Sequence, residues 1–187
     1  MTIIDHFEKY LGTIKQGWGG KDTSEEKSSV MVARFSNVPF DGASTYATIG
    51  LSDTVLALTN DRQVRQELMF AAHDIYSADA IASFLLTFSD YVRSKSCALA
   101  RGDVVGPSSP LIPGVISDAI YTCPPVIFPT GIDFYSGSSP STIIAWLVPL
   151  IGNESSVARQ KGSDYFEGLL EAQDPDLLDL NRVAVTR

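Results

Sequence analysis

The sequence predicts an α+β fold, with a mixed, mainly antiparallel sheet flanked by helices. Three observations support this prediction. Short segments rich in β-forming residues follow one another between residues 30 and 59. Helical patterns lie mainly at the N-terminus, at residues 77–95 and after residue 153. Strands and helices are therefore grouped along the chain more than they alternate, which is typical of α+β proteins.

A cap and an apolar stripe predict a helix at the N-terminus. Thr2 is a suitable cap, and Gly12 stands where a helix usually ends. Between them, apolar side chains recur at helical spacing, at Ile3, Ile4, Phe7 and Leu11. The following residues 15–29 contain three glycines and mixed charges, so we expect them to form a loop.

Strands are expected next, separated by turns. Residues 30–36 are rich in β-forming residues, and residues 44–53, STYATIGLSD, read as a strand that runs into a turn at its glycine. We interpret this second segment as scaffold, with hydroxyls that satisfy neighbouring groups. Strand composition resumes at 54–59, and Asn60–Asp61 forms a turn signal. Residues 64–73 fit either a strand or a helix.

The clearest helical pattern spans residues 77–95. Ser77 is a favourable N-cap, and Arg93 and Lys95 lie in the last turn, where cations interact favourably with the helix dipole. Between these ends, one face carries apolar side chains at a period of 3.6 residues: Ile81, Phe84, Leu85, Phe88, Tyr91 and Val92. The pattern predicts an amphipathic helix.

Prolines interrupt regular structure between residues 102 and 142. Within this region only short strands are expected, at LIPGVI (111–116) and VIF (126–128). The continuous apolar run TIIAWLVPL, residues 142–150, predicts a buried central strand with Trp146 in the core.

Two helices are predicted after this central strand. The first runs from Asn153 or Glu154 to Lys161 and ends at Gly162. Ser163 is expected to cap the second, whose inward face carries Phe166, Leu169 and Leu170. A last turn or loop opens at Asp174–Pro175.

The length and composition predict one domain that covers residues 1–187. A chain with 44% hydrophobic and 19% charged residues can bury a sizeable core. No run of about 18 apolar residues is present, so no transmembrane helix is expected. The N-terminal MTIIDHFEKYLG mixes charged and apolar residues, unlike a secretory signal. We therefore expect a cytoplasmic protein in which Cys97 and Cys123 are two thiols, although one disulfide is the alternative.

The net charge is −8, because 22 acidic residues outnumber 14 basic ones. Direct binding to nucleic acid is not expected, since neutralising phosphates requires Lys and Arg. An acidic surface instead permits electrostatic attraction to a basic partner. The alternative interpretation is that the acidic residues serve only solubility.

Sequence motifs provide no catalytic, metal-binding or cofactor-binding site. GWGGKDT, residues 17–23, lacks the first glycine of a phosphate loop and has Asp22 where Ser or Thr is required. His73 and Asp74 are adjacent, so on an extended strand they point to opposite faces and cannot act together. The hydroxyl-rich YSGSSPS, residues 135–141, lacks the pattern of a nucleophile elbow.

One charged feature is a candidate binding surface. Between Lys161 and Arg182 the chain carries only acidic charges. On the predicted helix, Asp164, Glu167 and Glu171 lie at i, i+3 and i+7 and share a face. We select as candidate partner contacts Asp164, Glu167, Glu171, Asp174, Asp176 and, with less support, Trp18. The alternative is an acidic face that is simply solvated.

Four segments, taken in order, resemble the bacterial suppressor-of-fused-like domain family. They are STYATIGLSD at 44–53, RQELMFAA at 65–72, PGVI at 113–116 and WLVPLIGNESSVARQKGSDYFEGLLEAQDPDLLDLNR at 146–182. The resemblance covers the chain from about residue 30 to residue 185. It rests on the order and spacing of the segments and on the DLNR ending.

The resemblance implies an α+β domain without known catalysis and without a catalytic motif to transfer. The animal relative sequesters a transcription factor by clasping a short peptide in a cleft between two domains, of which this chain resembles the first. Bacterial members look like immunity proteins or antitoxins that neutralise toxins, often nucleases.

These observations lead to three hypotheses. The first is a non-catalytic immunity protein or antitoxin that occludes a toxin, possessing an acidic surface that matches a basic partner. The second is a regulatory module that binds a peptide of another host protein, for example by strand addition at a sheet edge. The third is an enzyme, which would need a pocket that gathers His73 with carboxylates or a hydroxyl.

Overall fold

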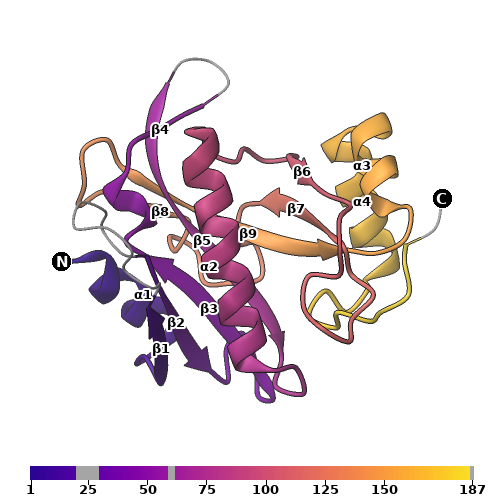
Figure 1. The fold of residues 1–187 in the computed structure, drawn as a ribbon, viewed down its shortest axis with the longest axis horizontal. Coiled ribbons are helices and arrows are strands. Elements are labelled where there is room, and N and C mark those ends of the chain that lie inside the picture. Colours follow the sequence, from indigo (N-terminus) through magenta and orange to yellow (C-terminus); the bar gives the residue numbers. More distant parts are fainter. Residues whose placement is uncertain (20–29, 59–61, 186–187) are drawn as a thin grey trace.

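The computed structural model describes residues 1–19, 30–58 and 62–185, and its backbone is organised around one sheet (Figure 1). The strand order is β1-β2-β3-β5-β9-β7-β6, with β4 beside β5 and β8 beside β9. Among the described strands, β5 and β9 pair in parallel and the other pairs are antiparallel. The bounds are β1 Gln16–Gly19, β2 Met31–Ser36, β3 Ala43–Ile49, β4 Leu56–Ala57, β5 Gln63–His73, β6 Val104–Val105, β7 Ala119–Cys123, β8 Phe134–Tyr135 and β9 Thr142–Leu150.

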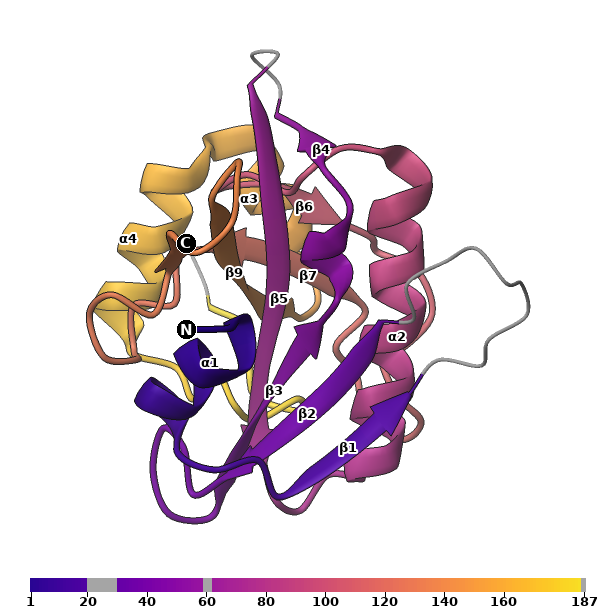
Figure 2. The ribbon, with the colours of Figure 1, turned by 90° about the vertical axis from the view of Figure 1, so that its left-hand side faces the viewer.

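Helices cover both faces of this sheet. Helix α2 lies on one face, whereas α1, α3 and α4 lie on the other, as the view along the sheet shows (Figure 2). The bounds are α1 Ile3–Leu11, α2 Ala78–Lys95, α3 Glu154–Lys161 and α4 Ser163–Gln173, with a 3₁₀ turn, η1, at Leu51–Asp53. The architecture confirms the predicted α+β class and its mixed, mainly antiparallel sheet.

The three layers enclose two hydrophobic cores, one on each face of the sheet. Strand β9 contributes to both because its side chains alternate: Trp146 packs with the α1, α3 and α4 side, and Leu147 with the α2 side. Both side chains are buried. The prediction that 142–150 is a buried central strand is therefore confirmed.

The described helices begin where the sequence predicts their N-terminal caps, with one exception. Thr2 caps α1 and forms a capping box with Asp5. Ser77 caps α2 by accepting a hydrogen bond from the backbone of Ala80 at 3.2 Å. The exception is α4, in which Ser163 is the first helical residue and Gly162 is the cap.

Several loop and strand predictions need correction. Residues 16–19, expected in a loop, form β1 because they pair with β2, while residues 20–29 lie outside the described part of the chain. The expected strands at 111–116 and 126–128 are loops and turns, in a region broken by prolines. The predicted strand at 54–59 is reduced to β4, and the predicted turn at Asn60–Asp61 lies outside the described residues.

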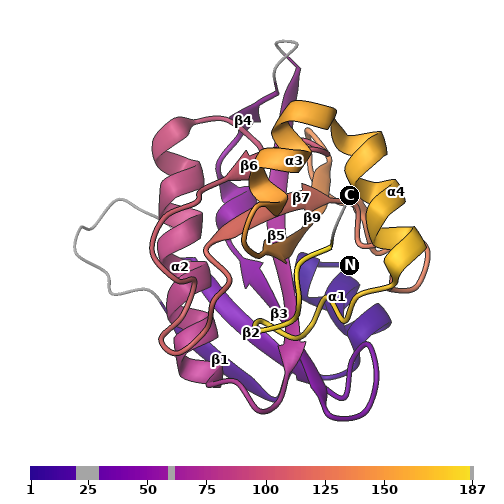
Figure 3. The ribbon, with the colours of Figure 1, turned by 90° about the vertical axis from the view of Figure 1, so that its right-hand side faces the viewer.

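The C-terminal strap, which we define as residues 174–185, crosses the end of the sheet (Figure 3). The ladder between β5 and β9 ends at the pair Met69–Trp146. Beyond that pair, Leu178 accepts a hydrogen bond from the backbone of His73, and Leu180 accepts one from Ser117, each at 3.3 Å. The strap therefore binds the backbone at the end of β5 and the backbone just before β7, in the region where β5 and β9 are no longer paired. Its Leu178 and Leu180 side chains are buried.

Candidate protein-binding surface

The acidic residues at the start of α4 are held by an arginine from elsewhere in the chain. Arg101 donates to Glu167 at 2.6 Å and to Asp164 at 3.0 Å. Tyr121 on β7 donates to the same Glu167 carboxylate at 2.7 Å. Hydrogen bonds from Arg101 therefore lower the pKa of Glu167, although partial burial opposes the shift. Arg101 therefore offsets one of the two negative charges of Asp164 and Glu167, and the pair with Glu167, whose side chain is 26% exposed, is the less exposed of the two.

Two of the predicted contacts are uncompensated. Glu171 on α4 and Asp174 at the start of the strap are exposed, and neither side chain forms a hydrogen bond or ion pair with a residue that the structure describes. Glu171 continues the acidic face of α4 away from Arg101. These two carboxylates are available to an external cation.

Asp176 is used to anchor the strap. Its carboxylate bonds the His73 ring nitrogen at 2.6 Å, across the end of β5. Nearby, Tyr76 donates to Asp179, and this hydrogen bond lowers the pKa of Asp179. The Asp176 side chain is still half exposed, at 52%, so it can also contact a partner.

Arg182 anchors the other end of the strap inside the protein. Its guanidinium forms two bonds to Glu154, at 2.6 and 2.7 Å, and the two side chains are 3% and 0% exposed. Glu154 also accepts hydrogen bonds from the backbones of Ile151 and Val185. Arg182, the arginine of the DLNR ending, therefore belongs to a buried structural ion pair and is not a surface charge.

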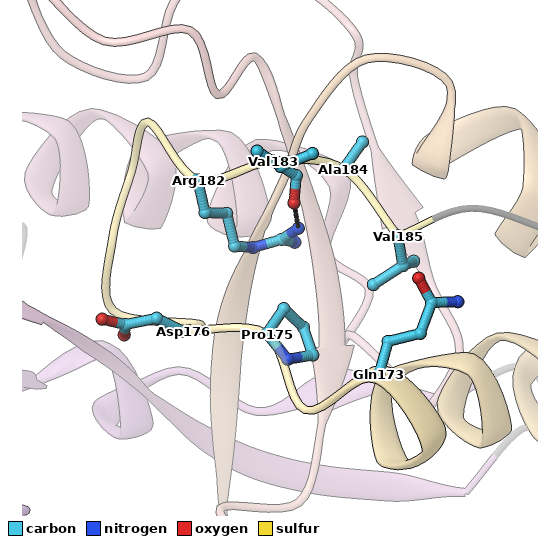
Figure 4. A pocket seen from close by; sticks show the side chains of 7 residues that line it. All are labelled: Gln173, Pro175, Asp176, Arg182, Val183, Ala184 and Val185. Atoms are coloured by element: carbon cyan, nitrogen blue, oxygen red, sulfur yellow. Dashed lines mark hydrogen bonds between the residues drawn. The ribbon is translucent and has the colours of Figure 1, made fainter.

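A cavity of about 260 Å³ lies between α4 and the two arms of the strap (Figure 4). The Arg182 guanidinium projects over it and donates to the Val183 carbonyl at 3.1 Å. Because Glu154 neutralises Arg182, the cavity offers no free cation from that side chain to a ligand. Its lining consists of Gln173, Pro175, Asp176, Arg182, Val183, Ala184 and Val185.

Trp18 lies on the edge strand β1, away from the acidic residues of α4. Its indole nitrogen donates to Asp79 of α2 at 2.8 Å, and its ring packs against Tyr46 at 6.2 Å between centroids. The side chain is partly buried against the α2 core. The structure therefore does not bring Trp18 together with the other predicted contacts.

The residues weighed for catalysis point away from each other. His73 bonds Asp176, whereas Asp74 bonds Arg34 at 3.0 Å and Ser44 at 2.6 Å, so the adjacent pair does not interact as a base and its orienter.

Burial and the nearby Glu167 raise the pKa of Cys123 to about 12, which keeps that thiol protonated. Among the described residues no group of three or more His, Cys, Asp or Glu side chains is arranged to hold a metal ion.

A buried acid explains the segment STYATIGLSD. Glu67 on β5 is fully buried and accepts hydrogen bonds from Thr48, the Gly50 backbone, and both the backbone and hydroxyl of Ser52, at 2.6 to 3.0 Å. Gly50 has φ of 100°, a left-handed conformation that favours glycine. The prediction that the hydroxyls of this segment satisfy a neighbouring group is confirmed, and that group is the buried Glu67 carboxyl, which was not predicted from the sequence.

Two arginines that organise the acidic C-terminal region were not predicted from the sequence. Arg101 lies in a loop more than sixty residues before α4 and carries no local signal of its contact. Arg182 follows the alternation of buried Leu178 and Leu180 along the strap, which was a signal that its side chain also turns inward.

The comparisons place this architecture in a family. Residues 26–183 match the family model described as "Suppressor of fused protein (SUFU)". The chain belongs to the suppressor of fused protein family, as the sequence resemblance indicated.

Individual relatives agree with this assignment. Immunity protein YqcF of Bacillus subtilis (strain 168) is 24% identical over 99% of this chain and 100% of its own length. A SUFU homolog from Neisseria gonorrhoeae FA 1090 has a TM-score of 0.80 at 14% identity, covering 99% of this chain and 95% of that one. Drosophila Suppressor of Fused has a TM-score of 0.64 at 14% identity, with 91% of this chain covering 46% of that protein.

A further solved structure, described as the Sufu–Fu complex, has a TM-score of 0.67 at 14% identity. The match covers 98% of this chain and 90% of that chain. These structural likenesses show a shared fold. In the part of the chain that the structure describes, no helix has both the length and the apolar character needed to cross a bilayer.

Proposed function

We propose that this chain is a non-catalytic immunity protein or antitoxin that acts in the cytoplasm as a single suppressor-of-fused-like domain. It neutralises a cognate toxin by binding and occluding it. The observation that carries the proposal is the likeness to an immunity protein along the whole length of both chains, at 24% identity.

The charge of the exposed surface suggests the kind of toxin. Glu171 and Asp174 are uncompensated, and Asp176 is half exposed. A toxin that binds phosphates, such as a nuclease, presents Lys and Arg, and carboxylates on the immunity protein can occupy such a site. The proposed partner is therefore a basic protein, bound without nucleic acid, membrane, metal or cofactor.

Co-expression tests the function. The protein encoded beside this gene is expressed alone and together with the chain, and growth of the host is measured. We expect growth arrest with the neighbour alone, rescue by the chain, and recovery of both proteins as a stoichiometric complex. Growth that is unaffected by the neighbour, or arrest that the chain does not relieve, contradicts the proposal for that pair.

Charge variants test the electrostatic part separately. Replacing Glu171, Asp174 and Asp176 with their amides is expected to slow association with the toxin by about tenfold or more at low salt. The matched control is Asp164→Asn, whose carboxylate is already paired with Arg101. Equal association rates for the triple variant and the parent would leave occlusion in place but remove the acidic surface from the proposal.

The alternative of a peptide-binding module is favoured by one feature of the sheet. At the β6 edge, Arg159 of α3 donates to the carbonyls of Val104 and Gly106 and so blocks strand addition. At the opposite edge, β1 has a strand partner only on its β2 side among the described strands. An extended peptide that binds by strand addition would therefore pair with β1. The variant Gly17→Pro would abolish binding of the peptide without affecting toxin neutralisation.

A further inference from the structure

We propose that a cationic protein segment docks on one end of the sheet, with Phe40 and Ile75 as its apolar anchors. This surface, which we call the three-loop surface, comprises residues 37–42, 73–77 and 174–181. The inference deepens the proposed function and rests on it, because it names the contact site and the chemistry of the partner.

The three loops form one surface because they are bonded to each other. The Asp74 backbone donates to the Gly42 carbonyl at 2.9 Å, joining the β2–β3 turn to the β5–α2 turn. The His73 backbone and ring bond Leu178 and Asp176, which joins both turns to the strap. Figure 3 shows the strap crossing this end of the sheet.

Two large apolar side chains are exposed on this surface. Ile75 is 82% exposed, and Phe40 is 49% exposed. The Phe40 ring lies 5.9 Å from the His73 ring, between centroids, so it is positioned against the surface instead of projecting freely. Exposed apolar side chains that gather on one surface and are rimmed by polar groups are typical of protein-interaction sites.

The charged side chains of the three loops are acidic, apart from His73. The three loops contain five aspartates, at positions 41, 74, 174, 176 and 179, and no Lys or Arg. Arg34 pairs with Asp74 and His73 with Asp176, whereas Asp41 and Asp174 form no side-chain bond within the described part of the chain.

This charge pattern selects the occupant. A second copy of the chain would bring aspartates against aspartates in a two-fold contact, which is unfavourable. A segment rich in Arg or Lys that also carries an aromatic or aliphatic side chain is complementary to both features. The three-loop surface therefore fits a basic partner better than self-association.

A phage-displayed library of random 12-residue peptides provides a test that needs no knowledge of the toxin. The full chain is the bait, and enriched peptides are then measured as synthetic peptides by calorimetry. We expect the enriched peptides to combine Arg or Lys with an aromatic or aliphatic residue. We expect their affinity to fall at least tenfold for the double variant Phe40→Ser/Ile75→Ser.

Matched variants show whether the effect belongs to this surface. Val126→Ser removes an apolar side chain that is 75% exposed on the loop after β7, and Asp90→Asn removes an exposed carboxylate on α2. Neither control is expected to change peptide affinity, whereas Asp41→Asn/Asp174→Asn is expected to weaken it. All variants change exposed positions, and an unchanged melting temperature verifies that they fold.

Three results would overturn the inference. They are an absence of enriched peptides, enrichment of peptides without basic residues, and equal affinity for the parent and the Phe40→Ser/Ile75→Ser variant. The test is separable from the proposed function. Peptide binding at this surface without toxin neutralisation would refute the immunity role alone, and neutralisation that persists in the double variant would refute this surface alone.

Discussion

Glu67 is an acidic side chain without exposed surface, and its proton is coupled to the stability of the protein. Burial raises its pKa to about 7 from an ordinary value of 4.5, although hydrogen bonds from Thr48, Ser52 and Gly50 oppose the shift. Between these pH values the folded protein retains a proton that the unfolded chain has released. The stabilising contribution is therefore complete below pH 4.5 and is lost as the pH rises to 7.

The variant Glu67→Gln is expected to abolish this pH dependence. Its amide can keep the contacts with Gly50, Ser52 and Thr48 but does not ionise. The free energy of unfolding of the parent should decrease by roughly 3 kcal/mol between pH 4.5 and 7, while that of the variant changes much less. Urea unfolding across this pH range measures the difference, with the exposed Glu171→Gln as control. A variant that keeps the parental slope would assign the pH dependence to another group.

The buried pair of Arg182 and Glu154 predicts a second effect. Removing the arginine by Arg182→Met leaves a buried carboxylate without its counter-charge and should lower the free energy of unfolding by about 3–5 kcal/mol. Adding Glu154→Gln removes that charge and should restore at least about 1 kcal/mol. Denaturant unfolding of both variants measures these changes. A double variant less stable than Arg182→Met would show that the backbone hydrogen bonds which Glu154 accepts from Ile151 and Val185 outweigh the cost of its unpaired charge.

At the scale of elements, the helices were predictable and several loops and strands were not. Helices α1 and α2 carry caps and periodic apolar faces within a few residues, so their bounds follow from local sequence. Strand β1 contains two glycines and forms through its pairing with β2, which local composition does not indicate. The same holds for the candidate surface. The spacing of Asp164 and Glu167 predicted that they share a helix face, but no local pattern predicted their contact with the distant Arg101.

Arg101 connects α4 to the sheet, and its removal should change the ionisation of α4. In Arg101→Gln, Glu167 loses its strongest donor, so its lowered pKa should rise towards the ordinary value. Because the Arg101 side chain is 49% exposed and solvent screens the pair, we expect only a small decrease in the unfolding free energy. An NMR titration of the Glu167 carboxyl group measures the shift, with Glu171 as internal reference. An unchanged pKa would mean that the hydrogen bond from Tyr121 is sufficient to keep the pKa of Glu167 lowered.

At the scale of the whole molecule, the central strands contribute side chains to both hydrophobic cores. The grouping of strands and helices predicted the fold class, but the strand order depends on pairings between distant residues, such as β5 with β9. No local pattern encodes such a pairing, whereas the continuous apolar run of β9 did encode burial on both faces. The strap adds a further long-range contact, since it bonds the backbones of His73, at the end of β5, and of Ser117, just before β7, beyond the end of the β5–β9 ladder.

Hydrogen exchange tests whether these central strands form the most stable unit. Residues 44–47 of β3 have strand partners on both sides, and β5 and β9 are paired with one neighbour or another along the buried centre of the sheet, so their amides should exchange only through global unfolding. Amides of β1 lie at a sheet edge and should exchange by local opening, more than about tenfold faster. Exchange followed by NMR under native conditions gives both rates. If β1 were as protected as β9, its outer edge would be covered, and the strand-addition alternative would lose the feature that favours it.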